Sequence, residues 1–126
     1  MRLLSYFEKR SLRELCKVGC AERAVLKLNE QGCMVMLTDP NEIKGSIGVA
    51  ESKALDESFA EALSQRSPVI FIIDSAGARI TDGLKGLSAF TRMFRSALDY
   101  RIAGLLLVST ASPVTLWCVT KCCRKI

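Results

Sequence analysis

Apolar residues recur along the chain with two different spacings, and these predict alternating helices and strands. Residues 50–65 carry apolar side chains at steps of three and four, the helical period, and residues 84–99 do the same. Between them, residues 69–73 form a continuous apolar run, which is typical of a strand covered on both faces. Residues 101–108 predict the next buried strand.

The N-terminal third has a weaker pattern. Leu12, Leu15 and Cys16 would share one face of a helix, whereas residues 21–28 fit a helix or a strand equally. Residues 32–37 predict a short apolar strand. The central order of helix, strand, loop, helix and strand, with short connections, indicates parallel βαβ units in a layered α/β domain.

Composition and charge exclude several classes of protein. The chain has 126 residues, 49% of them hydrophobic and 25% charged, which indicates one globular domain or part of one. The net charge of +5 comes from scattered basic residues without interleaved aromatic ones, so we expect no nucleic-acid binding. The chain contains no histidine, which excludes Ser-His-Asp and Cys-His catalysis by this chain alone. We predict no metal site.

The N-terminus and the cysteines indicate a cellular compartment. Charged residues follow the first methionine too soon for a signal peptide, so we expect a cytoplasmic protein with free thiols among its six cysteines. Residues 102–120 carry no charge, but their closely spaced Ser, Thr and Pro residues argue against a membrane span.

The apolar run at residues 69–73 opens onto a loop of small residues, Ser75, Ala76, Gly77 and Ala78. Ligands of α/β domains gather beyond the carboxyl ends of parallel strands, where bare backbone N–H groups can face an oxygen that gains negative charge. A strand-to-helix turn would use the same residue types for geometry alone, and both interpretations stay open on these grounds. Phosphate-loop and serine-elbow motifs are absent.

The stretch D-S-A-G-A-R-I-x-x-G at residues 74–83 resembles the D-S-G-G-A-R-I-x-x-G stretch of biotin-dependent acyl-CoA carboxyltransferases. That family includes the carboxyltransferase parts of acetyl-CoA and propionyl-CoA carboxylases, transcarboxylase and malonate decarboxylase. The G-S-I-G stretch at residues 45–48 is similar to the G-G-S-x-G that this family carries before the same helix. The similarity extends over residues 45–108.

The resemblance implies an α/β fold of the crotonase or ClpP-like type, a ββα spiral that is incomplete in this chain. It implies carboxyl transfer between biotin and an acyl-CoA or malonyl thioester, with the backbone amides of Ala76 and Gly77 as oxyanion donors. The oxygen held there would belong to the thioester or to biotin. Arg79 would brace the turn. The other residues expected against the substrate are Gly45, Ser46, Ser75 and Ala78.

The same resemblance implies the partners. No cofactor is expected to bind the chain directly: biotin would arrive on a biotin carrier protein, and CoA or an acyl carrier would bring the thioester. A second carboxyltransferase subunit, or self-association, would complete the assembly. Two alternatives stay open, namely another crotonase-like acyl-CoA enzyme and a non-catalytic fragment that associates with a full-length paralogue.

The sequence also departs from the family pattern. Ala76 stands where glycine is usual, and Lys44 stands where the family often has another glycine. We interpret residues 1–126 as a partial carboxyltransferase domain in which residues 109–126 are an atypical tail, because the glycine-rich second loop expected there is absent. A truncated or frameshifted gene product is one explanation and a genuine terminus the other; in the first case we expect the chain to be inactive alone.

Overall fold

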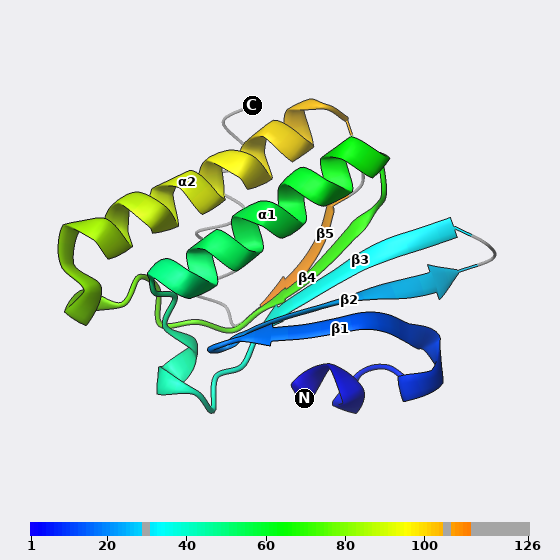
Figure 1. Cartoon of the computed structure of the whole chain (residues 1–126), viewed down its shortest axis with the longest axis horizontal. Coiled ribbons are helices and arrows are strands. Elements are labelled where there is room, and N and C mark those ends of the chain that lie inside the picture. Colours follow the sequence, from blue (N-terminus) through cyan, green and yellow to red (C-terminus); the bar gives the residue numbers. More distant parts are fainter. Residues whose placement is uncertain (29–30, 105–106, 112–126) are drawn as a thin grey trace.

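The computed structural model describes residues 1–28, 31–104 and 107–111 (Figure 1). Short 3-10 helices, labelled η, accompany the longer elements. In chain order the elements are η1 Arg2–Ser5, η2 Lys9–Ser11, β1 Leu12–Val18, β2 Ala21–Leu28, β3 Gln31–Thr38, η3 Ile43–Gly45, α1 Val49–Gln65, β4 Val69–Ile73, η4 Ile80–Asp82, α2 Gly83–Ile102 and β5 Leu107–Ala111.

The described strands form one five-stranded sheet in the order β1-β2-β3-β4-β5. β1, β2 and β3 pair antiparallel, whereas β3, β4 and β5 pair parallel. The parallel crossovers run through α1 and α2, which lie side by side over one face of the sheet (Figure 1). The α/β class and the parallel βαβ units predicted from the sequence are therefore confirmed, with an antiparallel hairpin added before them.

The predicted helix around Leu12, Leu15 and Cys16 is wrong, because these residues lie in strand β1. β1 pairs with β2, and its register shifts between Arg13 and Cys16, where Glu14 has a φ of 55°. The irregularity removes the two-residue alternation that would have identified a strand. Leu12 is buried but Leu15 and Cys16 are exposed, so the apparent helical stripe never forms a buried face.

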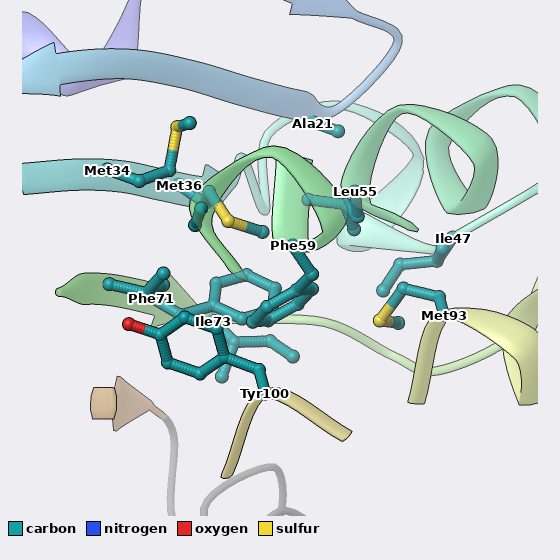
Figure 2. Close-up of a cluster of buried hydrophobic side chains, with 12 residues drawn as sticks. Ala21, Met34, Met36, Ile47, Leu55, Phe59, Phe71, Ile73, Met93 and Tyr100 are labelled. Carbon is teal, nitrogen blue, oxygen red and sulfur yellow. The ribbon is translucent and has the colours of Figure 1, made fainter. Parts of the chain in front are cut away.

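Apolar side chains pack on both faces of β4, as its unbroken apolar run predicted. Val69, Phe71 and Ile73 are buried on the side of the helices, where Phe71 meets the ring of Phe59 at a centroid distance of 5.8 Å (Figure 2). Ile70 and Ile72 pack against the second cluster on the opposite face. That second cluster consists of Leu3, Leu12, Ala24, Leu26, Cys33, Val35 and Leu37.

The strand predicted over residues 101–108 begins later than expected. Arg101 and Ile102 extend α2, and the strand runs from Leu107 to Ala111. Gly104 has a φ of 76°, a conformation that glycine adopts readily beyond the end of a helix. Of the predicted tail at residues 109–126, the first three belong to β5 and the others lie outside the described residues. No helix in the described ranges is long and apolar enough to cross a membrane.

Candidate functional site at the carboxyl end of β4

The candidate loop begins where β4 ends, and the neighbouring strand β3 anchors it there. The Asp74 amide donates to Thr38 Oγ1 at 2.8 Å, and the same hydroxyl donates to the Asp74 carbonyl at 3.1 Å. Thr38 is buried at the end of β3. Sequence reasoning did not identify this role of Thr38.

The candidate loop lies against residues 44–48, although about thirty residues separate the two loops. Ser75 Oγ donates to the Gly45 carbonyl at 2.5 Å, and the Ala76 amide donates to the Lys44 carbonyl at 3.1 Å. The structure therefore brings together Gly45, Ser75 and Ala76, which the sequence had assigned to one site.

A short parallel bridge between Ile47 and Ala78 continues this pairing. The Ile47 amide donates to the Gly77 carbonyl at 2.8 Å, and the Arg79 amide donates to the Ile47 carbonyl at 2.9 Å. Ala78, predicted to contact substrate, thus lies in the backbone ladder that holds the two loops together.

Backbone conformation explains the glycine at position 45. Gly45 has a φ of 69°, and a Cβ there would lie 2.2 Å from the Asp74 carbonyl oxygen. Lys44 also has a positive φ, 54°, at the position where the resembling family often has glycine. This departure therefore puts a lysine into a conformation that favours glycine.

Both amides predicted as oxyanion donors have acceptors within the protein. The Ala76 amide is bonded to Lys44, and the Gly77 amide donates to Ser75 Oγ at 3.0 Å. The backbone itself leaves room at Gly77, which has a φ of 102° and would place a Cβ more than 4 Å from any neighbour. The loop as described is thus open beside Gly77, with both donors engaged.

An ion pair between buried Glu51 and partly buried Arg79 lies beneath the two loops. Arg79 Nη2 lies 2.5 Å from Glu51 Oε2 and donates to the Ser46 carbonyl at 2.9 Å, and the Glu51 oxygen also accepts from the Gly48 amide at 2.9 Å. The side chains of Arg79 and Glu51 are only 19% and 5% exposed. The prediction that Arg79 braces the turn is confirmed, and Ser46 is buried against it.

Glu51 and Asp82 are residues that sequence reasoning missed. Glu51 occupies the third position of α1, where an acidic side chain can bond the amide that precedes the helix. Asp82 Oδ2 accepts from the Val49 amide at 2.9 Å, which ties the start of α2 to the start of α1. The three-residue spacing between Gly48 and Glu51 is the sequence signal that could have identified the role of Glu51.

Cys20 lies next to this ion pair. Its thiol donates to the Ser46 carbonyl at 3.4 Å, and burial, with a smaller contribution from the Glu51 charge, raises its pKa to about 11. The raised pKa keeps this thiol protonated at neutral pH. In the described part of the chain no group of three or more His, Cys, Asp or Glu residues could hold a metal ion.

Comparison with known proteins identifies relatives. Residues 29–111 match the carboxyl transferase domain family. The chain is 32% identical over 89 residues to the acetyl-CoA carboxylase carboxyl transferase subunit beta of Lactobacillus helveticus, covering 70% of this chain and 32% of that protein. The subunit of Limosilactobacillus reuteri (strain DSM 20016) is 27% identical over 93 residues, covering 74% and 37%. The chain thus spans about a third of the length of these relatives.

Solved structures share the fold. A transcarboxylase 12S hexamer core with methylmalonyl-CoA bound superposes with a TM-score of 0.72 at 20% identity, covering 88% of this chain and 25% of that chain. A Pseudomonas malonate decarboxylase hetero-tetramer gives a TM-score of 0.73 at 14% identity, covering 90% and 50%. The crotonase-type α/β fold predicted from the sequence is confirmed. Together with the family match, this shows that the chain belongs to the carboxyl transferase family of biotin-dependent enzymes.

Proposed function

We propose that this chain takes part in moving a carboxyl group between biotin and an acyl-CoA or malonyl thioester. In the carboxylating direction the C–N bond of carboxybiotin and a C–H bond beside the thioester carbonyl break, a C–C bond forms at that carbon, and its proton goes to the biotin nitrogen. The observation that carries the proposal is the position of the loop after β4. In this member of the family, the loop lies at the carboxyl edge of the parallel strands and is hydrogen-bonded to residues 44–48.

The two proposed oxyanion donors differ in how readily they become free. The Gly77 amide is held by a side-chain hydroxyl, so rotation of Ser75 about χ1 releases it toward the open space beside Gly77. The Ala76 amide bonds a backbone carbonyl, and its release requires Lys44 to move. A hydrogen bond of this kind contributes about 1 kcal/mol net, so a substrate oxygen can replace either acceptor. We assign Gly77 as the first donor and Ala76 as the second.

The other small residues of the two loops would then face the substrate. Gly45, Ser75 and Ala78 lie beside the Gly77 amide through the contacts above, whereas buried Ser46 acts through Arg79. Biotin would be supplied on a carrier protein and the acyl group on CoA or an acyl carrier, and the chain would hold no cofactor itself. Cytoplasmic location accords with the free thiols of Cys16, Cys20 and Cys33.

A second carboxyltransferase subunit, or a second copy, would complete the site. Large apolar side chains are exposed around the loop: Ile80 is 93% exposed, Leu84 84% and Ile43 66%. Such residues gathered beside a candidate site favour association with another protein surface. The same observation supports the second candidate function, a non-catalytic fragment that binds a full-length paralogue.

Ligand-induced thermal stabilisation tests the proposed function. We expect acetyl-CoA or malonyl-CoA, and separately a biotinylated carrier domain, to raise the melting temperature of the chain mixed with its partner subunit. Gly77→Val should abolish the shift. Gly104→Val is the matched control, because Gly104 also has a positive φ and open space around a Cβ but lies at the far end of α2.

The outcomes separate the candidates. Loss of the shift in both variants, or its persistence in Gly77→Val, would count against a ligand oxygen at Gly77. Stabilisation by CoA thioesters without any response to biotin would indicate another crotonase-like acyl-CoA enzyme. Co-elution with a full-length paralogue in size-exclusion chromatography, without any ligand shift, would identify the non-catalytic fragment.

A further inference from the structure

We propose that Glu51 is a positioning residue, which fixes the candidate loop through the partly buried Arg79 guanidinium. The proposal has a second part: the charge of Arg79 is used within the protein and is not a binding site for the anionic group of a substrate. The catalytic consequence rests on the proposed function, whereas the positioning itself does not.

Arg79 joins both loops at once. Its amide bonds the Ile47 carbonyl, and its side chain reaches the carbonyl and hydroxyl of Ser46 at 2.9 Å and 3.3 Å. Arg79 also follows Gly77 by only two residues. Any displacement of its guanidinium is therefore transmitted to the peptide groups that carry the candidate donors.

Glu51 determines where that guanidinium can lie. The Glu51 carboxylate accepts from both Arg79 and the Gly48 amide, and it belongs to the first turn of the seventeen-residue helix α1, which packs along α2. A helix anchored by its own buried face is a rigid support. The carboxylate thus fixes the position of the loop relative to helix α1.

Glycine residues leave space for this pair from two directions. A Cβ on Gly48 would lie 2.7 Å from Arg79 Nη1 and 2.5 Å from Asp82 Oδ2. A Cβ on Gly19, in the turn between β1 and β2, would lie 2.7 Å from Glu51 Oε1. Backbone from β1–β2 and from the 44–48 loop therefore closes around the carboxylate and the guanidinium.

The charges of Glu51 and Arg79 explain why loss of either one should affect the loop. A partly buried charge that loses its partner is unfavourable, so an unpaired Arg79 would move toward solvent and its contacts with the backbone would weaken. Conversely, a guanidinium already paired with a carboxylate that is 5% exposed attracts a further anion only weakly. Removal of the Arg79 charge should therefore disorder the loop without removing a substrate-binding cation.

Amide hydrogen exchange of the isolated full chain, measured by NMR without substrate, tests the inference. We expect Glu51→Gln and Arg79→Met to accelerate exchange at Ala76 and Gly77 at least about tenfold, relative to core amides of β3 such as Val35. Glu61→Gln is the matched control, because Glu61 lies on the same helix as Glu51 but away from the loops. Its ion pair, at 2.6 Å, is with Arg23 of β2. This variant should leave the ratio unchanged.

Two results would overturn the proposal. One is uniform acceleration of loop and core amides in Glu51→Gln, which would indicate a purely global contribution to stability. The other is unchanged loop exchange in Arg79→Met, or in the polar variant Arg79→Gln if Arg79→Met fails to fold. Because no ligand is present, failure of the proposed carboxyl transfer leaves this measurement intact. A titration of the chain with malonate tests the second part: Arg79→Gln, which removes the charge, and the unaltered chain should bind it equally weakly, and clearly weaker binding by Arg79→Gln would overturn that part.

Discussion

Ser75 Oγ donates to the Gly45 carbonyl at 2.5 Å and accepts from the Gly77 amide at 3.0 Å, so one hydroxyl joins two loops that lie thirty residues apart in the chain. In the function proposed above, a ligand oxygen at Gly77 would have to replace this hydroxyl. Ser75 would then have two effects, because it stabilises the closed loop and competes with an incoming acceptor.

Ser75→Ala should separate these two effects. Removing the hydroxyl deletes both bonds, and we expect the free energy of unfolding to fall by about 1–2 kcal/mol. The Gly77 amide loses its internal acceptor at the same time, so its hydrogen exchange should accelerate more than that of Ala76. Urea denaturation and exchange measured on the same sample check both expectations. Ser64→Ala, on an exposed position of α1, is the control and should change neither.

Gly45→Ala tests the close approach of the two loops. The new Cβ would lie 2.2 Å from the Asp74 carbonyl oxygen at a φ of 69°, so we expect a loss of more than about 2 kcal/mol of unfolding free energy. Gly104→Ala also has a positive φ, 76°, but open space, and it should lose only about 1–2 kcal/mol. Equal losses in the two variants would mean that backbone strain, and not the contact with Asp74, is what glycine relieves.

The helices α1 and α2 and the strand β4 could be predicted because their apolar residues follow the helical period or an unbroken run. In β4 the residues alternate between two covered faces, and an unbroken apolar run is what that arrangement requires. β1 could not be predicted in this way, since its register shift at Arg13–Cys16 disrupts the period on which such reasoning depends.

The site was predicted at the level of segments but not of contacts. The motif at residues 74–83 and the glycines at residues 45–48 identified two loops that do lie together. Spacing along the chain carried no information on which hydrogen bonds the amides of Ala76 and Gly77 would make. Likewise, Glu51 gave only a helix-start signal, and its pairing with Arg79 depends on how α1 packs beside the loop.

Thr38→Val should loosen the start of the loop. Thr38 Oγ1 exchanges two hydrogen bonds with the Asp74 backbone at a buried position, and valine keeps the shape while leaving the amide and carbonyl without this partner. We expect a loss of about 1–3 kcal/mol in unfolding free energy. Thr38→Ser retains the hydroxyl and should keep most of the unfolding free energy that the valine variant loses. A serine variant as unstable as the valine variant would attribute the effect to packing of the methyl group instead.

Alkaline pH should destabilise the protein through Cys20. Burial raises the pKa of this thiol from its ordinary value of 9.0 to about 11, so the native state holds its proton more tightly than the unfolded state. The resulting stability is complete below about pH 9 and is lost as the pH rises toward about 11, by up to roughly 2–3 kcal/mol. Tyr100, whose pKa burial raises to about 12, acts in the same direction at higher pH.

Denaturation curves at a series of pH values measure this loss. Cys20→Ala should be less stable at neutral pH, because it loses packing and the bond to the Ser46 carbonyl, but its stability should fall less steeply above about pH 9. Cys16→Ala, on an exposed position of β1, should keep the slope of the unaltered chain. If the Cys20→Ala slope equals that of the control, alkaline unfolding does not proceed through the thiol beneath the loops, and Tyr100 becomes the group to change next.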